Sequence, residues 1–521
     1  MPLGTLRTTP PPDGRAVRAE PAPPPGGTSI MTTIAAADRP RSDRSTGERS
    51  TEDRPTDERS SGEPAGDARP ARNRSRAAQP RTGQTQAAQT QAAQTQAAQT
   101  RTAQARDDRP RDDRSAGEGP ADPGPAPERE ALEAALAGLP RVVDLLAARA
   151  EEHDRDGTFP YQGIEAVHEA GLLTLTVSPR YGGPGGTLAD TVRVLARLGR
   201  GDASVAVVTA FTLLRHAGQA RRPGWPAAGY RRLLTESRRG PALVNTLDAE
   251  PGGREPGAPP ATVARPDGEG GWLLTGRKTY CTGAEALAWM AVTARTDEPE
   301  PRTGTFLVRG ESEGLEIDPT WDQLGLRASA SHDVVLDGVR VPADLALGLT
   351  VTAATGGAAS GPADEEAEAR LARAWHDLAL AAVAIGVARA AEDWLIRFLN
   401  QRTPANLTEP LGTLPRYRCA LGEIEAHLIG AEELVEGLAP RVDRGDPEAV
   451  ARTGPAHLLA IRAATTAVQQ AVALTGSPGL SRRHPLERYL RDVLSSRVHL
   501  APEEAVLDAA GRVALERGAR P

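Results

Sequence analysis

The segment GWLLTGRKTYCTGA at residues 271–284 combines apolar and β-branched residues with a closing Thr-Gly pair, which is typical of a strand that ends in a turn. Further short runs of this kind lie on both sides of it, between turns rich in Gly, Pro and Asp: ALVN, ATVAR, WMAVTAR, TFLV, LEI and VVLDGVRV. Their lengths and spacing predict a small antiparallel sheet or barrel, a β domain that we place at residues 241–349.

The region before this domain, residues 126–240, carries helical periodicity. Apolar residues recur at alternating spacings of four and three along one predicted helix: Leu132, Leu136, Leu139, Val143, Leu146 and Ala150. Pro140 interrupts this stripe and predicts a kink or two helices. Further helices are predicted at 164–170, where Gly171 supplies a C-cap, and near 188–198 and 204–215.

The region after the β domain returns to helices. Residues 350–364 read as a linker, and residues 365–521 as a helical bundle. One continuous helix is expected through Leu378 and Leu395, and further helical runs at 415–442, 447–475, 485–499 and 503–517. The predicted fold class is therefore mainly α with a central β domain, and ligand pockets favour the interfaces of such domains.

Residues 1–125 have the composition of a low-complexity tail. No Leu, Ile, Val, Met, Phe, Tyr, Trp or Cys lies between Ile34 and Leu132, and QTQAA repeats occupy residues 84–100. Such a stretch buries too little apolar surface to offset chain entropy, so we expect it to be disordered. A docking arm is the alternative reading, and Met31 is an alternative start.

The charge balance argues against several partners. The chain carries a net charge of −7, which divides into +2 for residues 1–125 and −9 for the remainder. An acidic folded region is unlike a nucleic-acid binder. No apolar run reaches the length of a membrane span, and no secretory signal is visible, so a cytoplasmic location is predicted. Two cysteines indicate neither a disulfide framework nor a metal cluster.

Four segments in order resemble the acyl-CoA dehydrogenase superfamily: AGLLTLTVSPRYGG (170–183), GWLLTGRKTYCTGA (271–284), LGLRASASHDVVLDGVRVP (324–342) and HPLERYLRD (484–492). The resemblance spans residues 130–500. It implies an N-terminal helical domain, a β domain and a C-terminal four-helix bundle, with a flavin between the last two. It also implies a homodimer or homotetramer and a flavin-dependent oxidoreductase that acts on an acyl-CoA-like or other small organic substrate.

The resemblance assigns two flavin contacts to the second segment. Thr282 occupies the position whose hydroxyl and backbone N–H bond the flavin near N5, where a donor stabilises the reduced, anionic form. Tyr280 occupies the place of an aromatic beside the ring. Lys278, the only lysine of the chain, is predicted to be an exposed strand residue. Cys281 is predicted to be a buried structural thiol, because it alternates with Tyr280.

The chain departs from the family where the dehydrogenation base is expected. Counting along the late helix places Leu500 at the usual glutamate position, and the other known position, on the first long bundle helix, holds His376. Glu503 and Glu504 follow closely and would reach the site only with a local insertion. Neither standard position therefore carries a carboxylate.

His499 directly precedes the missing glutamate and is our candidate catalytic residue. Flavin monooxygenases built on this fold, such as the dibenzothiophene monooxygenase type, carry a histidine there and also lack the glutamate. A histidine beside a flavin can give or take a proton near neutral pH, since its unperturbed pKa is about 6.5. A histidine that caps helix carbonyls is the alternative reading.

The adenine end of the flavin has two candidate contacts. Many family members bind the FAD pyrophosphate with an arginine from a neighbouring subunit, and here Arg402 keeps that position without the usual Gln-Phe-Gly sequence. A Gly-rich turn survives as TGSPG, in which Gly476 lets backbone N–H groups approach phosphate. The resemblance favours FAD, and FMN remains open.

Three function classes remain open on the sequence. Family frequency favours acyl-CoA-like dehydrogenation. The residues at the base positions favour a monooxygenase, which would need a flavin reductase as partner. A non-catalytic flavin-binding or scaffold protein is the third.

Overall fold

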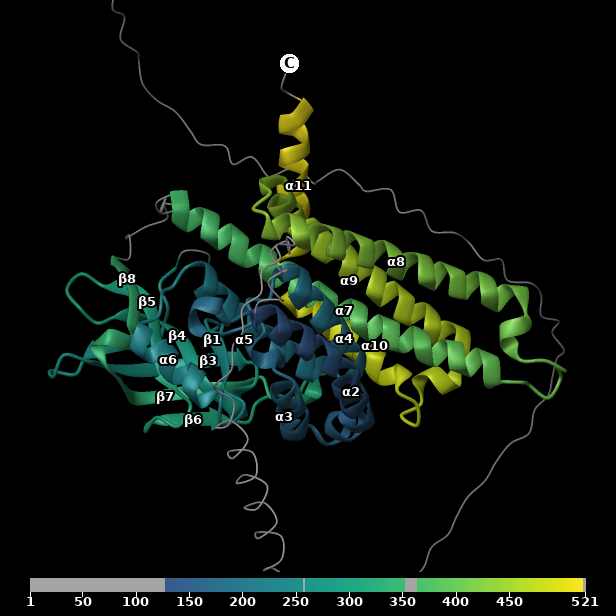
Figure 1. Ribbon diagram of the computed structural model, residues 1–521, viewed down its shortest axis with the longest axis horizontal. Helices are drawn as coiled ribbons and strands as arrows, with labels where there is room; N and C mark the ends of the chain where they lie inside the picture. Colours follow the sequence, from purple (N-terminus) through teal and green to yellow (C-terminus); the bar gives the residue numbers. More distant parts are fainter. Residues whose placement is uncertain (1–126, 256–257, 352–362, 519–521) are drawn as a thin grey trace, which may run out of the picture. The chain divides into compact units, whose positions relative to one another are not determined.

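The computed structural model describes residues 127–255, 258–351 and 363–518, so the predicted tail and most of the predicted linker lie outside the described residues. Helices come first, a sheet follows, and long helices end the chain, which confirms the predicted order (Figure 1). No helix within these ranges has the length and apolar character needed to cross a bilayer.

The N-terminal helices match the predicted positions with two differences. They are α2 (Pro127–Asp156), α3 (Tyr161–Glu169), α4 (Leu188–Gly201), α5 (Ala203–Arg221) and α6 (Ala227–Glu236). The stretch around Pro140 is one helix rather than two, and α6 was not predicted. Asp202 caps α5 by accepting hydrogen bonds from the backbone of Ser204 and Val205, which fixes where this buried helix begins.

The sheet is mixed, whereas the sequence predicted antiparallel pairing. Its strands are β1 (Leu243–Leu247), β2 (Val263–Pro266), β3 (Trp272–Cys281), β4 (Leu287–Thr296), β5 (Arg302–Arg309), β6 (Leu315–Asp318), β7 (His332–Val341) and β8 (Ala346–Val351). The order is β6-β7-β3-β2-β4-β5-β8, and β1 pairs with β4. Both β1 and β2 run parallel to β4, because long connections let the chain return before pairing. The strand β8, which reaches into the predicted linker, was not predicted.

The C-terminal helices lie where the sequence predicted them. They are α7 (Ala363–Gln401), α8 (Pro415–Asp443), α9 (Pro447–Thr475), α10 (Leu486–Ser495) and α11 (Glu503–Gly518), and a short 3₁₀ turn, Ser496–His499, follows α10. The predicted run at 485–499 is therefore an α-helix that tightens in its last turn.

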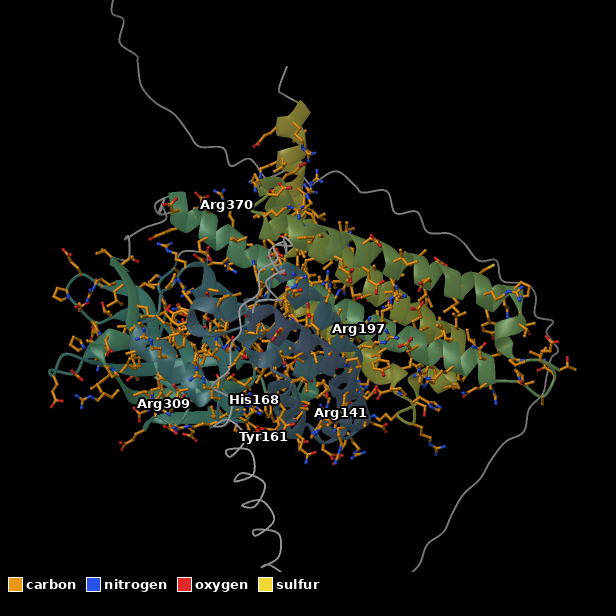
Figure 2. All side chains as sticks on the ribbon, in the orientation of Figure 1. Arg141, Tyr161, His168, Arg197, Arg309 and Arg370 are labelled. Atoms are coloured by element: carbon orange, nitrogen blue, oxygen red, sulfur yellow. The ribbon has the colours of Figure 1, made fainter. Side chains whose placement is uncertain are left out.

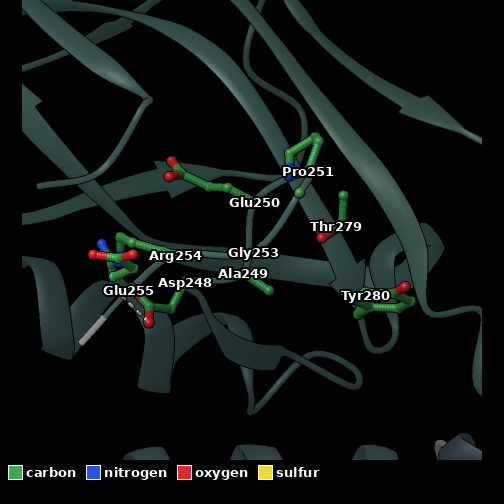
Figure 3. A pocket seen from close by; sticks show the side chains of 10 residues that line it. Asp248, Ala249, Glu250, Pro251, Gly253, Arg254, Glu255, Thr279 and Tyr280 are labelled. Carbon is green, nitrogen blue, oxygen red and sulfur yellow. Dashed lines mark hydrogen bonds and ion pairs between the residues drawn. The ribbon is translucent and has the colours of Figure 1, made fainter. Parts of the chain in front are cut away.

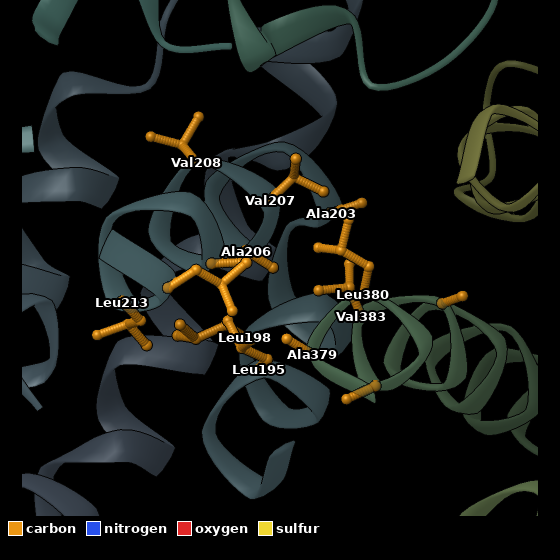
Figure 4. Packing of buried hydrophobic residues seen from close by; sticks show 14 of the residues in the cluster. Leu195, Leu198, Ala203, Ala206, Val207, Val208, Leu213, Ala379, Leu380 and Val383 are labelled. Atoms are coloured by element: carbon orange, nitrogen blue, oxygen red, sulfur yellow. The ribbon is translucent and has the colours of Figure 1, made fainter. Parts of the chain in front are cut away.

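Helix α5 forms the wall between the sheet and the bundle. Its neighbours α4 and α7 pack so closely at Gly199 that a Cβ atom there would lie 2.6 Å from the carbonyl oxygen of Val383. Buried apolar side chains of the three helices, among them Leu195, Ala206 and Leu380, fill the space between them (Figure 4). One face of α5 therefore meets the bundle while another contacts β1, through Thr212 and Val244.

Candidate functional site

The end of strand β3 forms a strained turn. Pairing with β7 shifts register between Lys278 and Cys281, so the residues between them bulge out of the ladder. Tyr280 lies in this bulge with φ of 56°, and its side chain is 66% exposed. Non-glycine residues with positive φ cost energy and cluster at functional sites. The resemblance placed an aromatic contact here, and the structure presents this ring to solvent.

Thr282 follows the bulge and is buried, with its hydroxyl 3.0 Å from that of Ser331. Its carbonyl accepts a hydrogen bond from Asn245 Nδ2 at 3.1 Å. Its backbone N–H donates to the Tyr280 carbonyl at 3.0 Å, so that donor already has a partner within the turn. A hydroxyl donates once and accepts twice, so Thr282 Oγ1 keeps capacity for a ligand.

An opening of about 550 Å³ lies beside Tyr280 and Thr279 (Figure 3). The loop after β1, residues 248–255, forms the rest of its wall. Among the described residues that line the opening, Arg254 is the one cation, and it pairs with Asp248 at 2.9 Å. The same lining carries Glu250 and Glu255, so the opening suits an uncharged ring better than a phosphate.

Lys278 is buried, which corrects the prediction that it is an exposed strand residue. Its ammonium lies 2.7 Å from Glu250 Oε1. Glu250 also accepts hydrogen bonds from the backbone of Ala261 and from the backbone and hydroxyl of Thr262. Burial alone would raise the pKa of Glu250, but these donors lower it to about 2. The pair ties the loop that lines the opening to strand β3.

Cys281 behaves as predicted from its alternation with Tyr280. It is 1% exposed, and burial raises its pKa to about 12. A thiol with that pKa stays protonated and unreactive at neutral pH.

Two histidines that the sequence analysis considered separately converge on one aromatic ring of α5. The ring centroids of Phe211 and His499 are 6.0 Å apart, and those of Phe211 and His376 are 6.3 Å apart. His376 comes from α7 and His499 from the turn after α10. Val208, three residues before Phe211 on α5, lies close to Gly283, the residue that follows Thr282. The histidine cluster and the β3 turn thus share one wall.

A buried carboxylate, Asp377, and a third histidine, His457, lie behind His376 and His499. Asp377 Oδ1 lies 3.4 Å from His457 Nδ1, and Thr453 donates its hydroxyl to Oδ2 at 3.2 Å. Burial would raise the pKa of Asp377, but His457 and the neighbouring His376, whose Nδ1 lies 3.9 Å from Oδ1, lower it to about 2. The sequence analysis missed Asp377, His457 and Phe211, because each is an ordinary helix residue until the three helices meet.

The surroundings of His499 correct the expectation of a near-neutral pKa. Burial, with His376 and His457 nearby, lowers its pKa to about 3, so the imidazole is neutral at pH 7. Leu500 packs against the core beside it. Glu503, the candidate displaced base, forms an ion pair with Arg462 instead.

A cavity of about 1350 Å³ opens next to the histidines, between α7, α9 and α11. His376, His499 and Asp377 lie on one side of it, and apolar side chains such as Val506 on another. Arg370, on the first part of α7, also lines it (Figure 2). Its volume exceeds what a small organic molecule needs.

Arg402 and Gly476 are not part of this arrangement. Arg402 follows His376 along α7 and lies about 39 Å farther along the helix axis, at 1.5 Å per residue. Gly476 ends α9, with φ of 64°, and both residues are exposed. The structure therefore brings together Tyr280 and Thr282, and separately His376 and His499, but places the two adenine-end candidates elsewhere.

Comparisons with known proteins identify three matching models of one family. They are acyl-CoA dehydrogenase, N-terminal domain, at residues 141–219; middle domain, at 248–339; and C-terminal domain, at 378–504. The matches follow the helix–sheet–helix order of the described chain.

Two relatives are named for different reactions. The chain is 29% identical over 381 residues to the putative acyl-CoA dehydrogenase YdbM of Bacillus subtilis, which covers 72% of this chain and 95% of YdbM. It is 30% identical over 379 residues to the amino sugar nitrososynthase RubN8 of Streptomyces rubradiris, which covers 70% of this chain and 85% of RubN8.

Solved structures of both kinds share the fold. KijD3, in complex with FMN and dTDP-3-amino-2,3,6-trideoxy-4-keto-3-methyl-D-glucose, is 28% identical with a TM-score of 0.63, covering 76% of this chain and 95% of KijD3. Butyryl-CoA dehydrogenase from Megasphaera elsdenii is 22% identical with a TM-score of 0.64, covering 76% of this chain and 100% of that protein. At this identity the likeness shows a shared fold and nothing more. The same holds for dibenzothiophene monooxygenase TdsC from Paenibacillus sp. A11-2 (22% identity, TM-score 0.62, 74% and 97% covered).

Proposed function

Since the chain belongs to the acyl-CoA dehydrogenase superfamily and is a flavin-dependent oxidoreductase, we propose that it is a flavin-dependent monooxygenase that acts on a small organic substrate. The reduced flavin is supplied by a separate flavin reductase. The observation that carries this proposal is that, in the described structure, both family positions of the base lack a carboxylate and hold Leu500 and His376 instead.

Dehydrogenation of an acyl thioester needs a group that removes an α-proton. Leu500 stands at the usual position of this base and has no proton acceptor. Asp377 is the carboxylate in contact with the histidine cluster, but its pKa of about 2 makes it a poor base. Glu503 is neutralised by Arg462. The described residues therefore offer no competent base at either family position.

The three imidazoles suit a reaction in which oxygen is activated beside the flavin. His499 is neutral at pH 7 and can donate one hydrogen bond and accept another, which lets it hold a proton close to the reacting atoms. Asp377 holds the His457 ring, and the Phe211 ring packs edge-on against that of His499. A bound flavin supplies the electron transfer to oxygen, and Thr282 would hold its ring.

The relatives support oxygen chemistry on an amine or another small molecule. RubN8 is a nitrososynthase, and a nitroso group carries an oxygen atom that the parent amine lacks. KijD3 binds FMN together with a nucleotide-linked amino sugar. The cavity of about 1350 Å³ beside His499 has room for a substrate of that size.

We propose FMN as the flavin, with FAD as the alternative. KijD3, which is 28% identical to this chain, has a solved structure that contains FMN, and this supports the choice. Arg402 and Gly476 lie far along the bundle from the histidine cluster, so an FAD would take its pyrophosphate contacts from these residues of a second copy in a homodimer or homotetramer.

Acyl-CoA dehydrogenation is the second candidate, favoured by the match to YdbM over 95% of its length. The two reactions differ in how fast the reduced flavin reacts with oxygen. We expect protein loaded with FMN and photoreduced without substrate to be reoxidised by oxygen about as fast as free reduced FMN. Strong suppression of that rate would favour the dehydrogenase, and a failure to bind FMN or FAD would favour a scaffold.

A further inference from the structure

We propose that Ser331, backed by Ser329, is a positioning residue that orients the hydroxyl of Thr282 as a hydrogen-bond donor toward the flavin. This inference rests on the proposed flavin site at Thr282. It does not depend on whether the reaction is oxygenation or dehydrogenation.

Three buried hydroxyls form a chain that ends at Thr282. Ser329 Oγ lies 2.8 Å from Ser331 Oγ, which lies 3.0 Å from Thr282 Oγ1. The exposed fractions of the three residues rise along the chain, from 1% at Ser329 through 4% at Ser331 to 7% at Thr282. The chain therefore leads from the protein interior toward the surface of the β3 turn.

The count of hydrogens gives the chain a direction. Each hydroxyl has one hydrogen. Whichever way the hydrogen bonds run along the three hydroxyls, the hydroxyl at one end keeps a hydrogen that neither of the other two accepts. If Thr282 donated to Ser331, the unused hydrogen would lie on Ser329, the most buried of the three, where an unsatisfied donor is costly. If Ser329 donates first, the unused hydrogen lies on Thr282. The second direction leaves the donor where the resemblance expects the flavin.

The backbone holds this chain in a strained conformation. Gly283 N donates to the Ser329 carbonyl at 2.9 Å, and Ala284 N donates to the Ala330 carbonyl at 3.1 Å, which fixes the two segments to each other. Ala330, between the two serines, has φ of 42°, and Tyr280 has φ of 56°. Across the described ranges, positive φ outside glycine is confined to these two residues and Leu326, so the strain gathers in the two segments that carry the hydroxyls.

Helix α10 anchors the serine segment from the bundle side. The backbone N–H of Leu326 donates to Asp492 Oδ1 at 2.8 Å. The Leu326 carbonyl accepts a hydrogen bond from the indole of Trp321 at 3.0 Å. Both backbone groups of this strained residue are thus satisfied, which adds a second anchor to the hydrogen bonds from Gly283 and Ala284.

A chain of hydroxyls strengthens the terminal donor, because each hydrogen bond polarises the next. A stronger donor stabilises the negative charge that a flavin gains on reduction. Removing Ser331 should therefore weaken binding of reduced flavin more than binding of oxidised flavin.

The test compares Ser331→Ala with Ser331→Thr, which keeps the hydroxyl. Kd values for oxidised and for reduced FMN are measured anaerobically, with no substrate present, by quenching of flavin fluorescence and from the midpoint potential. We expect Ser331→Ala to weaken reduced FMN relative to oxidised FMN about threefold to tenfold, the range of one hydrogen bond. Ser331→Thr should stay close to the parent protein.

The double variant Thr282→Val/Ser331→Ala distinguishes a positioning role of Ser331 from a purely structural one. A purely structural role would not depend on the Thr282 hydroxyl. We expect the double variant to match Thr282→Val, because Ser331 acts on the flavin only through that hydroxyl. An unchanged Kd ratio in Ser331→Ala, or an additive loss in the double variant, would overturn the proposal. If Ser331→Ala fails to fold, Ser329→Ala replaces it, with a smaller expected loss in the same direction.

Failure of this inference differs from failure of the proposed function. The Kd ratio is measured without oxygen, so it can be unchanged in a working monooxygenase and altered in a dehydrogenase. If the parent protein bound neither FMN nor FAD, both the inference and the proposed function would fail.

Discussion

Asp377 Oδ1 lies 3.4 Å from His457 Nδ1, and this contact helps to lower the pKa of the carboxylate that backs the histidine cluster. With His376 and Thr453 also directed at it, Asp377 keeps its negative charge down to a pH of about 2. In the proposed mechanism Asp377 holds imidazoles in place. Among the described residues beside Phe211, the histidines are then the groups that donate and accept hydrogen bonds.

Replacing His499 should separate flavin binding from turnover. We expect His499→Ala to lower turnover about 10²–10³-fold, the range for losing one hydrogen-bond donor directed at developing charge, while FMN still binds. Glu503→Gln and Glu504→Gln are the matched controls and should stay active. The pH profile of turnover in the parent protein should show no step near 6.5 from His499, because its pKa is about 3. Full activity of His499→Ala in a steady-state assay would remove this residue from the mechanism.

Thr282→Val tests the flavin contact itself. Valine keeps the shape of the side chain and removes the hydroxyl, so the fold should survive while the flavin loses a donor. We expect the midpoint potential or the FMN affinity to change by an amount equivalent to about 1–3 kcal/mol. A parent-like potential and affinity in anaerobic spectroelectrochemistry would place Thr282 away from the flavin.

Removing one member of the buried Lys278–Glu250 pair should destabilise the protein strongly. Lys278→Met leaves the Glu250 carboxylate buried without its cation, which typically costs about 3–5 kcal/mol of unfolding free energy. Arg265→Gln, which breaks an exposed pair with Asp297, is the control and should cost at most about 1 kcal/mol. Urea unfolding measures both. Equal losses in the two variants would show that the buried pair contributes no more than an exposed one.

His216 should make the protein less stable in mild acid. It is 1% exposed, and burial lowers its pKa to about 4 while its Nδ1 lies 2.9 Å from the Tyr230 hydroxyl. Below pH 6.5 the unfolded chain takes up a proton that the folded chain refuses. Stability from this group is therefore full above pH 6.5 and is lost as the pH falls toward 4, by about 2 kcal/mol at pH 5.

Urea unfolding of the parent protein and of His216→Gln at pH 7.5 and pH 5 measures this contribution. The glutamine variant should be less stable at pH 7.5, but its loss between the two pH values should be smaller by about 2 kcal/mol. The same pH dependence in both proteins would contradict the assignment to His216.

The sequence predicted the order of elements because their signals are local. The helical stripe from Leu132 to Ala150 and the short runs around residues 271–284 need no long-range information. The parallel pairing of β1 with β4 was missed, because register and direction depend on contacts between distant segments. Lys278 was placed on the surface for the same reason, since its partner Glu250 lies on another loop.

The candidate site was predictable only where a family resemblance supplied the positions. It pointed to Thr282, Tyr280, His376 and His499, and the structure places the last two around one ring. No sequence signal connected them with Asp377 and His457, which α7 and α9 bring together from 80 positions apart. Nor could the sequence give the lowered pKa of His499, because burial and neighbouring charges set it.

The central claim is that substrate does not reduce the flavin by losing an α-proton, and anaerobic titration with acyl-CoAs tests it most directly. Purified protein carrying its own flavin, or reconstituted with FMN, is titrated with saturated acyl-CoAs of short, medium and long chain while the visible flavin absorbance is followed. We predict that the absorbance persists with every acyl-CoA and disappears on addition of dithionite. Stoichiometric loss of the absorbance with any one acyl-CoA would contradict the account and identify the protein as a dehydrogenase.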